Sequence, residues 1–186
     1  MKRKIKINDL DLEYQIIHRD VKYARLEIKN GDLQLIIPLN YSNHEEVVDK
    51  HRDWIYRKIF RIKQLQKDAK EKEIEFNRTD DEFRHLVRSY IMNISLDLKV
   101  NVNRVSFRKM KSRWGSCSPA GNININTCLK YLPSHLIEYV VYHELTHLLE
   151  RKHDKRFWSI VSSKYHNYRE IDEELSIYWF LVKDLS

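Results

Sequence analysis

The segment from Leu136 to Leu149 constrains the fold most, because it is apolar enough for a core helix yet carries ionisable side chains. Its residues form two adjacent stripes at helical spacing, one with Leu136, Val140, His143 and His147 and the other with Ile137, Val141, Leu145 and Leu148. A helix that is apolar almost all round is a buried helix. Buried histidines and glutamates are costly unless they coordinate or hydrogen-bond to something. The fold must therefore supply a partner for these polar groups.

Residues 143–147, His-Glu-Leu-Thr-His, have the pattern H-E-x-x-H inside this helix. Side chains four residues apart face the same side, so His143 and His147 can point at one metal ion. Glu144 is turned by about 100° from His143 and can reach a water bound to that ion. Ordinary buried histidines with hydrogen-bond partners are the alternative, and a third ligand decides between the two interpretations.

His153 is the third ligand that we favour. Glu150 lies on the same face, but seven residues of helix place it roughly 10 Å along the axis from His143, too far for one ion. On a continuous helix His153 would be rotated by about 240° from His147, so it can ligate only if the helix ends first. Arg151 and Lys152 favour such an end, and Asp154 can cap a new helix. A carboxylate of the last helix remains the alternative: Glu170, Glu173 or Glu174.

Three histidines with an open fourth position are typical of a catalytic zinc site. We therefore expect one Zn²⁺ per chain, held by His143, His147 and His153. Cys117 and Cys128 are the only cysteines, which excludes a four-cysteine zinc site and a disulfide scaffold. We expect both cysteines to be small buried residues and not metal ligands.

The N-terminal part alternates with a period of two residues, which predicts strands in hairpins over residues 3–40 with the best turn at Asn30-Gly31. Ser42 and Glu45 resemble a capping box, and the apolar spacing after them predicts a helix to about Phe76. A second helix is expected from about Asp80 to Leu98.

The remaining elements are a hairpin and three helices. Period-two alternation over 102–110 and 122–129 predicts a hairpin around a turn-rich segment. Helices are expected at 134–151, 154–165 and 168–183. The order of strands, helices, hairpin and helices favours an α+β fold over a wound βαβ sheet.

At 186 residues, the chain is expected to form one domain, 1–186, with hairpins in 1–41, a helical segment in 42–98 and the catalytic part in 99–186. Its net charge is +7, from 34 Lys and Arg against 27 Asp and Glu. The whole excess falls between Lys99 and Ile137, which contains seven basic residues and no acidic one. This distribution suggests that charge selects what approaches one region of the surface.

No stretch has the length and apolar character of a membrane span, and the start MKRKIKINDL lacks the apolar core of a secretion signal. The two cysteines also fit a reducing compartment. We therefore expect a cytoplasmic protein without a membrane partner, and the sequence leaves its oligomeric state open.

The string HELTHLLERKHDKRFW, preceded by RWGSC and a short strand, resembles the YgjP-like metallopeptidases, relatives of the SprT-like and WLM zincins. The detailed match spans about residues 107–158. The resemblance implies a zincin-like α+β fold, zinc on the three histidines, and Glu144 as the catalytic carboxylate. It also implies hydrolysis of peptide bonds in a peptide or protein substrate, with Glu144 as the general base for a zinc-activated water.

Candidate substrate-binding residues lie around this segment. Zincins commonly hold substrate as an extra strand at a sheet edge, and residues 122–126 are a plausible edge strand with Asn122, Asn124 and Asn126 on one face. Arg113 or His166 could stabilise a developing oxyanion, and the sequence does not choose between them. A half-buried strand without substrate contact is the alternative for the asparagines.

Two other functions stay open. The basic segment 99–137 could bind nucleic acid, and SprT-like relatives act on proteins attached to DNA, so a DNA-associated protein is one alternative. No standard nucleic-acid-binding motif is visible, however. A zinc hydrolase of a non-peptide amide is the other alternative.

Overall fold

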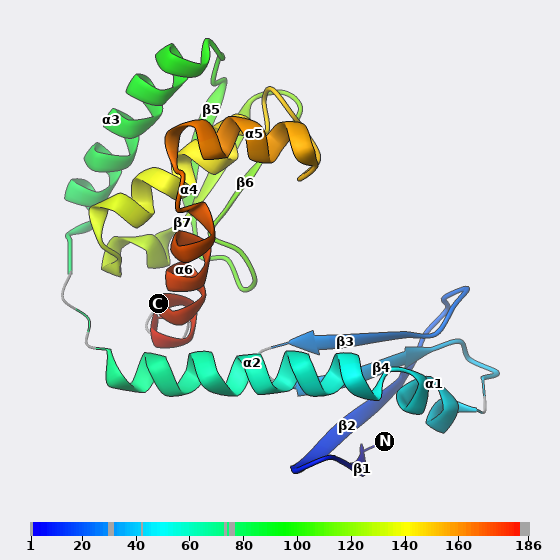
Figure 1. The fold of residues 1–186 in the computed structure, drawn as a ribbon. Coiled ribbons are helices and arrows are strands. Elements are labelled where there is room, and N and C mark those ends of the chain that lie inside the picture. Colours follow the sequence, from blue (N-terminus) through cyan, green and yellow to red (C-terminus); the bar gives the residue numbers. More distant parts are fainter. Residues whose placement is uncertain (1, 30–31, 42, 73, 75–76, 183–186) are drawn as a thin grey trace. The chain divides into compact units, whose positions relative to one another are not determined.

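A computed structural model describes residues 2–29, 32–41, 43–72, 74 and 77–182 of the chain. The Cα positions divide it into two compact units, 1–67 and 68–186, with the boundary inside one helix (Figure 1). The expected single domain and its three segments therefore remain a prediction. Among the described residues, no helix combines the length and apolar character that a membrane span requires.

The first unit contains a four-stranded sheet in the order β1-β2-β4-β3. Its strands are β1 (Lys2–Ile7), β2 (Leu10–His18), β3 (Arg25–Lys29) and β4 (Asp32–Ile37). The pairs β1-β2 and β3-β4 are antiparallel, which confirms the two hairpins, and β2 and β4 pair in parallel. The predicted turn at Asn30-Gly31 lies outside the described residues.

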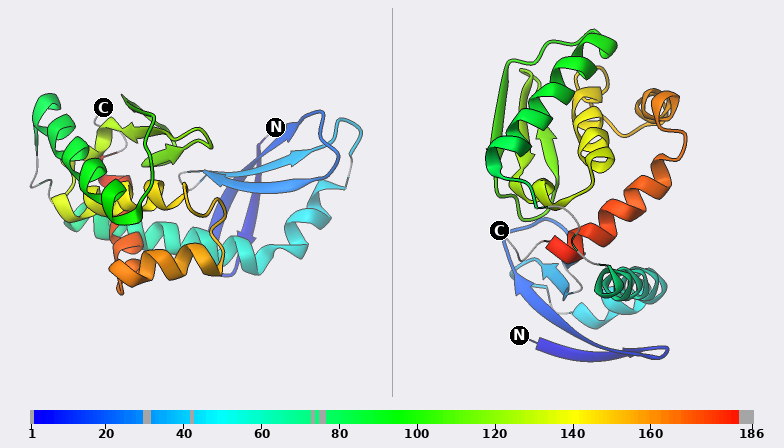
Figure 2. Two further views of the ribbon diagram at one scale, coloured as in Figure 1. Left: turned by 90° about the horizontal axis from the view of Figure 1, so that it is seen from above. Right: turned by 90° about the vertical axis from the view of Figure 1, so that its left-hand side faces the viewer.

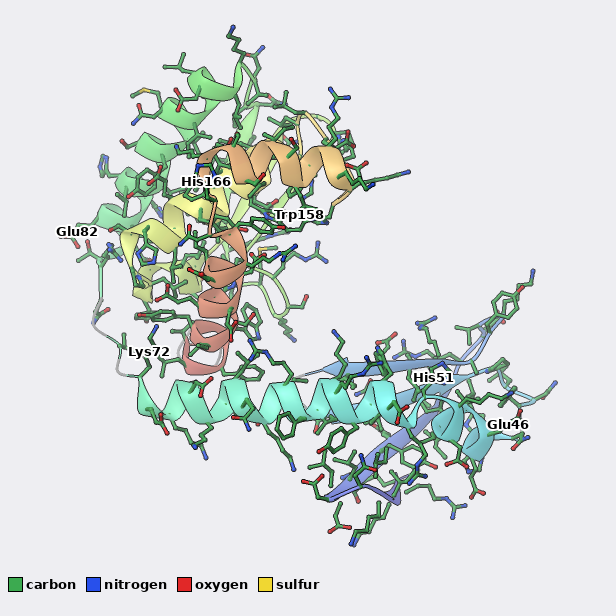
Figure 3. All side chains as sticks on the ribbon, viewed as in Figure 1. Glu46, His51, Lys72, Glu82, Trp158 and His166 are labelled. Atoms are coloured by element: carbon green, nitrogen blue, oxygen red, sulfur yellow. The ribbon has the colours of Figure 1, made fainter. Side chains whose placement is uncertain are left out.

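Two helices follow the sheet instead of the single helix predicted from Ser42 to Phe76. They are α1 (His44–Lys50) and α2 (Arg52–Glu71), and Val48, Ile55 and Ile59 pack into the same core as the sheet. The break falls at His51, which leaves helical geometry with φ −114° and ψ 14° and lies at the junction of the two helices in Figure 3. Ser42 and residues 75–76 lie outside the described residues, so the predicted capping box stays a prediction.

The second unit begins with α3 (Asp80–Leu98), whose predicted bounds are confirmed. Thr79 caps it: the Thr79 hydroxyl accepts from the Glu82 N–H, and the Glu82 carboxylate accepts from the Thr79 N–H at 2.8 Å. Its inner stripe, Phe83, Val87, Ile91 and Ile94, is buried against α4 (Ser134–Thr146) and the neighbouring sheet. This core encloses the helix that carries the H-E-x-x-H segment.

The second sheet corrects the predicted hairpin between residues 102–110 and 122–129. Strand β5 (Arg104–Arg108) runs parallel to β7 (Asn122–Asn126), and the short β6 (Gly115–Cys117) pairs antiparallel with the other side of β7. The turn-rich segment between the two predicted strands thus contributes a strand of its own. Because the order is β5-β7-β6, strand β7 is central.

The two faces of this sheet differ in polarity, as a period of two requires. Val105, Phe107, Ile123 and Ile125 belong to the core that α3 and α4 share. The neighbouring rows, Arg104 beside Asn122 and Ser106 beside Asn124, point to the other face. A 3₁₀ turn (Thr127–Tyr131) then leads to α4, followed by α5 (Lys155–Lys164) and α6 (Tyr168–Val182), and Figure 2 shows α3 and α4 beside the sheet. The α+β class is confirmed.

Candidate metal centre

Helix α4 is buried almost all round, as its sequence predicts. Nine of its side chains are buried, including Leu136, Val140, Val141 and Leu145. The helix ends at Thr146, five residues earlier than predicted, so His147 occupies its C-cap. The N–H groups of Leu149 and Glu150 both bond to the Thr146 carbonyl at 2.9 Å, in the turn that follows the helix.

A second helix starts soon after this turn, and its capping residue is the one the sequence indicates. The Asp154 carboxylate accepts hydrogen bonds from the N–H groups of Arg156 and Phe157, which fixes the first turn of α5. His153 precedes this cap and lies in the turn between α4 and α5. The end of α4 and the start of α5 together bring His153 back toward His143.

The three histidines converge. The Nε2 atoms of His143 and His153 lie 2.9 Å apart, and one ring nitrogen from each of the three histidines lies within 4.8 Å of the others. Within the described part of the chain, this is the one group of three or more His, Cys, Asp or Glu side chains close enough to hold a metal ion. Three nitrogen donors turned toward one point fit a zinc ion well.

Neighbouring groups fix the orientation of the imidazole rings. The Nδ1 of His147 lies 3.1 Å from the Glu150 carbonyl oxygen, which leaves its Nε2 for a metal. The Trp158 indole N–H donates to the His153 carbonyl at 3.2 Å, and its ring stacks on the His153 ring with centroids 5.8 Å apart. Phe157 packs against all three histidine rings. Phe157 and Trp158, which end the string HELTHLLERKHDKRFW, thus support the histidine cluster directly.

The electrostatics of the cluster suit metal binding. Burial lowers the pKa of His143 to about 3, with a further contribution from His147 and His153, and burial also lowers the pKa of His147. Neutral imidazoles are the form that coordinates a metal. Burial raises the pKa of Glu144 to about 7, and the positive charge of Arg113 opposes this rise.

Glu144 lies in close contact with β6. A Cβ atom at Gly115 would lie 2.7 Å from the Cγ of Glu144 and 2.8 Å from its Oε1. These separations are shorter than real Cβ contacts, so this position accommodates only glycine while Glu144 stays in place. The RWGSC segment therefore adjoins the catalytic candidate from the sheet side.

A cleft of about 470 Å³ contains the histidine cluster and the strand β6 together. It is lined by Ser112, Arg113, Gly115, Ser116, Cys117, His143, Glu144, His147, Arg151 and His153. A second cavity of about 230 Å³ shares Arg113, Gly115, His143 and Glu144 and extends to Trp114, Tyr139, Val140, Asp172 and Leu175. Arg113, a predicted substrate-binding residue, therefore borders both spaces.

The structure does not bring the other predicted substrate-binding residues into these two spaces. Asn122, Asn124 and Asn126 belong to the central strand, so the expectation of an edge strand is wrong: both sides of β7 are already paired. Asn126 is fully buried and holds the preceding loop, because its amide donates to the carbonyls of Met110 and Arg113 at 2.9 Å. The Asn124 amide donates to the Ser116 hydroxyl at 3.1 Å across the sheet.

His166 is exposed at the turn between α5 and α6, where Figure 3 labels it, and it lines neither space. The alternative third ligands also lie elsewhere. Glu174 pairs with Lys72 at 3.0 Å and lies 3.2 Å from His135, and Glu170 and Glu173 are exposed. The geometry thus favours His153 over the carboxylates of α6.

Sequence reasoning missed Asp172, Tyr139 and Leu175 as site residues. Asp172 follows the buried Ile171 and precedes the buried Leu175 by about one turn. A carboxylate among the inward-facing residues of the last helix is the sequence signal that indicates a site residue there. Cys117, expected as a buried small residue, is half-buried in the cleft wall, where burial raises its pKa to about 11. Arg151, which the sequence indicates only as a residue that favours the end of the helix, also lines the cleft.

Comparisons with known proteins complete these observations. A family model described as YgjP-like, metallopeptidase domain, matches residues 77–178. No curated protein matches the chain. Among solved structures, the metallopeptidase zymogen of Pyrococcus abyssi abylysin is similar with 22% identity and a TM-score of 0.45, over 48% of this chain and 90% of that chain. The metallopeptidase zymogen of Methanocaldococcus jannaschii jannalysin has 20% identity and a TM-score of 0.43, over 49% and 92%.

The family match covers more than half of the chain and contains α3, the second sheet, α4 and α5. It therefore includes every element that carries the histidine cluster, Glu144 and the RWGSC segment. The chain belongs to the YgjP-like metallopeptidase family and is an enzyme of the hydrolase class.

Proposed function

We propose that this enzyme is a zinc peptidase in which His143, His147 and His153 hold the ion and Glu144 moves the protons. The convergence of three histidine nitrogens within 4.8 Å carries the proposal. When bound, a zinc ion supplies Lewis acidity, which polarises a carbonyl group and makes water a better nucleophile at neutral pH.

Glu144 is the general base in this proposal. Its carboxylate adjoins the cleft beside His143 and Gly115, where it can accept a proton from an attacking water. Desolvation raises its pKa to about 7, and a carboxylate with a pKa near the working pH can both accept a proton and return it to the leaving amine. Arg113 borders the same cleft, and its positive charge can stabilise a developing oxyanion.

Strand β6 replaces β7 as the proposed edge for a substrate strand. Its outer side adjoins the cleft, and its inner side pairs with β7. Ser118 N–H bonds to the Asn122 carbonyl and Asn126 N–H to the Trp114 carbonyl, so alternation directs the main-chain groups of Gly115 and Cys117 away from β7. A peptide in extended conformation can hydrogen-bond to these groups with little demand on its sequence.

Substitution of Glu144 by Gln tests the mechanism. The Gln variant keeps the size of the side chain but cannot accept the proton, so we expect unchanged zinc content by elemental analysis and at least a hundredfold loss of peptide hydrolysis. Equal hydrolysis by the variant and the parent would exclude Glu144 as the base. His153→Ala is the matched metal test: zinc near one per chain in the parent and little in the variant supports the ligand set, and unchanged zinc would exclude His153.

A panel of small amides tested beside peptides separates a peptidase from a zinc hydrolase of a non-peptide amide. Preferential cleavage of the small amides would overturn the peptidase assignment.

A second candidate function is association with nucleic acid through residues 99–137. Exposed arginines without acidic partners favour it. Arg104 and Arg108 are exposed at the edge strand β5, and neither has an acidic partner within 4 Å among the described residues. Binding that depends on such residues weakens steeply as salt increases. A titration of duplex DNA at low and high salt tests this function, and absence of binding at low salt would exclude it.

A further inference from the structure

The smaller cavity beside the histidine cluster has the dimensions of a side-chain pocket. Its volume of about 230 Å³ is below the roughly 300–1,000 Å³ of pockets that enclose a whole small molecule. It shares Glu144 and His143 with the cleft, so a group bound in it would be attached to a substrate whose reacting bond lies at the metal centre. The pocket therefore bears on which residue flanks that bond.

Most of the pocket wall is apolar. Val140 and Leu175 are buried, and Trp114 lies edge-on against Trp179 with ring centroids 4.9 Å apart. Such walls favour the aliphatic stem of a long side chain, whatever its terminal group. The polar groups of the wall then determine which terminal group is preferred.

Asp172 is the polar group contributed by α6. Its Oδ1 accepts a hydrogen bond from the Tyr139 hydroxyl at 2.9 Å, which holds the carboxylate in one orientation. Among the described residues, no Lys or Arg lies within 4 Å of Asp172, whereas Glu174 on the same helix pairs with Lys72 at 3.0 Å. Burial raises the pKa of Asp172, since its charge lacks a close cationic partner in this apolar setting.

The other charged groups of the pocket act at a different point. Arg113 is the basic residue of the wall, and its positive charge lowers the pKa of Glu144. The wall of the pocket therefore combines the basic Arg113, which acts on Glu144, with the acidic Asp172, which has no Lys or Arg within 4 Å among the described residues.

We propose that this pocket binds a lysine or arginine side chain of the substrate next to the scissile bond, and that Asp172 determines this specificity. The aliphatic stem would lie against Trp114, Val140 and Leu175, and the cationic head would pair with the free oxygen of Asp172. The proposal rests on the proposed peptidase function, because it assigns the pocket to a residue beside the bond that is cleaved.

Matched peptides test the proposal. The peptides are N-acetylated and C-amidated, and each carries Lys, Arg, Gln or norleucine at one position of an otherwise uncharged sequence. The position of this residue is varied from peptide to peptide. Cleavage by the zinc-loaded enzyme is measured for the parent, for Asp172→Asn and for Asp97→Asn, which removes the same charge from an exposed position of α3 outside the pocket. Binding of the Lys and norleucine peptides is measured separately by fluorescence anisotropy.

The parent is expected to cleave Lys and Arg peptides about tenfold to a hundredfold better than the norleucine peptide, the range for a charge-assisted hydrogen bond. In Asp172→Asn the ratio of the Lys or Arg rate to the norleucine rate should fall to about one, and Asp97→Asn should keep the ratio of the parent. A preference within twofold of the parent in Asp172→Asn overturns the proposal.

The anisotropy measurement of binding separates a failure of the proposed peptidase function from a failure of the pocket assignment. If the parent cleaves no peptide but binds the Lys peptide more tightly than the norleucine peptide, and Asp172→Asn abolishes that difference, the peptidase function fails and the pocket assignment stands. Equal binding of the two peptides by the parent overturns the pocket assignment.

Discussion

Gly115 and Glu144 form the tightest constraint at the scale of single residues. A Cβ at Gly115 would approach a carboxylate oxygen of Glu144 to 2.8 Å, so glycine is the residue that leaves room for the Glu144 side chain. Asn126 holds the two residues before Gly115: its side-chain amide donates to the Arg113 carbonyl, and its backbone N–H donates to the Trp114 carbonyl. Segments far apart in the sequence, around Gly115 and Asn126, thus fix the surroundings of Glu144, the proposed base.

Gly115→Ala is expected to displace the Glu144 carboxylate, because the end of a flexible side chain yields more easily than two packed backbones. An error of about 1 Å at a reacting group costs roughly a hundredfold in rate. We expect kcat to fall by about that factor while zinc content stays near that of the parent, measured by peptide hydrolysis and elemental analysis.

Gly121→Ala is the control for this prediction. Gly121 has φ +74°, where alanine is strained by about 1–2 kcal/mol, and it lines neither space of the metal centre. It should lower the melting temperature and leave kcat unchanged. Normal kcat in Gly115→Ala would show that Glu144 is not held by this contact.

At the scale of elements, the important feature is where α4 ends. The helix carries His143 and ends at Thr146, and His147 follows at its C-cap, one turn after His143. The turn to α5 then returns His153 to the same point. Both helices are short, so neither has much stability without packing. Phe157 and Val161 of α5 are fully buried, and this burial anchors the turn.

Asp154→Ala removes the N-cap of α5 and leaves the N–H groups of Arg156 and Phe157 without their acceptor. We expect a loss of about 0.5–2 kcal/mol in the free energy of unfolding. Because His153 adjoins the cap, zinc affinity should also fall, by about tenfold. Chemical denaturation and a competitive zinc titration measure the two effects.

Thr79→Ala removes a comparable cap from α3, far in sequence from the histidines. It should cost a similar free energy and leave zinc affinity unchanged. If both variants reduced zinc affinity equally, the effect of Asp154→Ala would reflect general destabilisation instead of the position of His153.

At the scale of the whole molecule, the chain consists of two compact units with separate cores. The histidine cluster, Glu144, both spaces and the whole basic excess of residues 99–137 belong to the second unit. A ligand that binds only one unit should stabilise that unit in preference to the other.

Zinc is therefore expected to raise stability unevenly along the chain. At a free concentration a hundred times its dissociation constant, a bound ligand adds about 2.7 kcal/mol. Hydrogen exchange with and without zinc should show increased protection in α4 and in residues 147–153, and little change in β1 and β2 of the first unit. A uniform increase over both units would contradict this prediction, and His143→Ala should abolish the increase.

The sequence was informative where local rules decide the structure. Asp154 is the cap that the sequence predicts for the helix after the histidine segment, and it caps α5, because caps act within three or four residues. The H-E-x-x-H spacing similarly brings His143 and His147 together through helix geometry alone. The break at His51 and the end of α4 at Thr146 were not predicted, since both depend on how the chain packs beyond one turn.

By itself, the sequence determined the α+β class, the buried helix with its two histidines and glutamate, and the family. These follow from periodicity, capping and a contiguous motif, which are properties of neighbouring residues. The tertiary structure decided that β7 is central, that β6 borders the cleft, that Gly115 contacts Glu144 and that Asp172 faces a pocket beside them. These are pairings between distant segments, and their free energies depend on which surfaces meet in the folded chain.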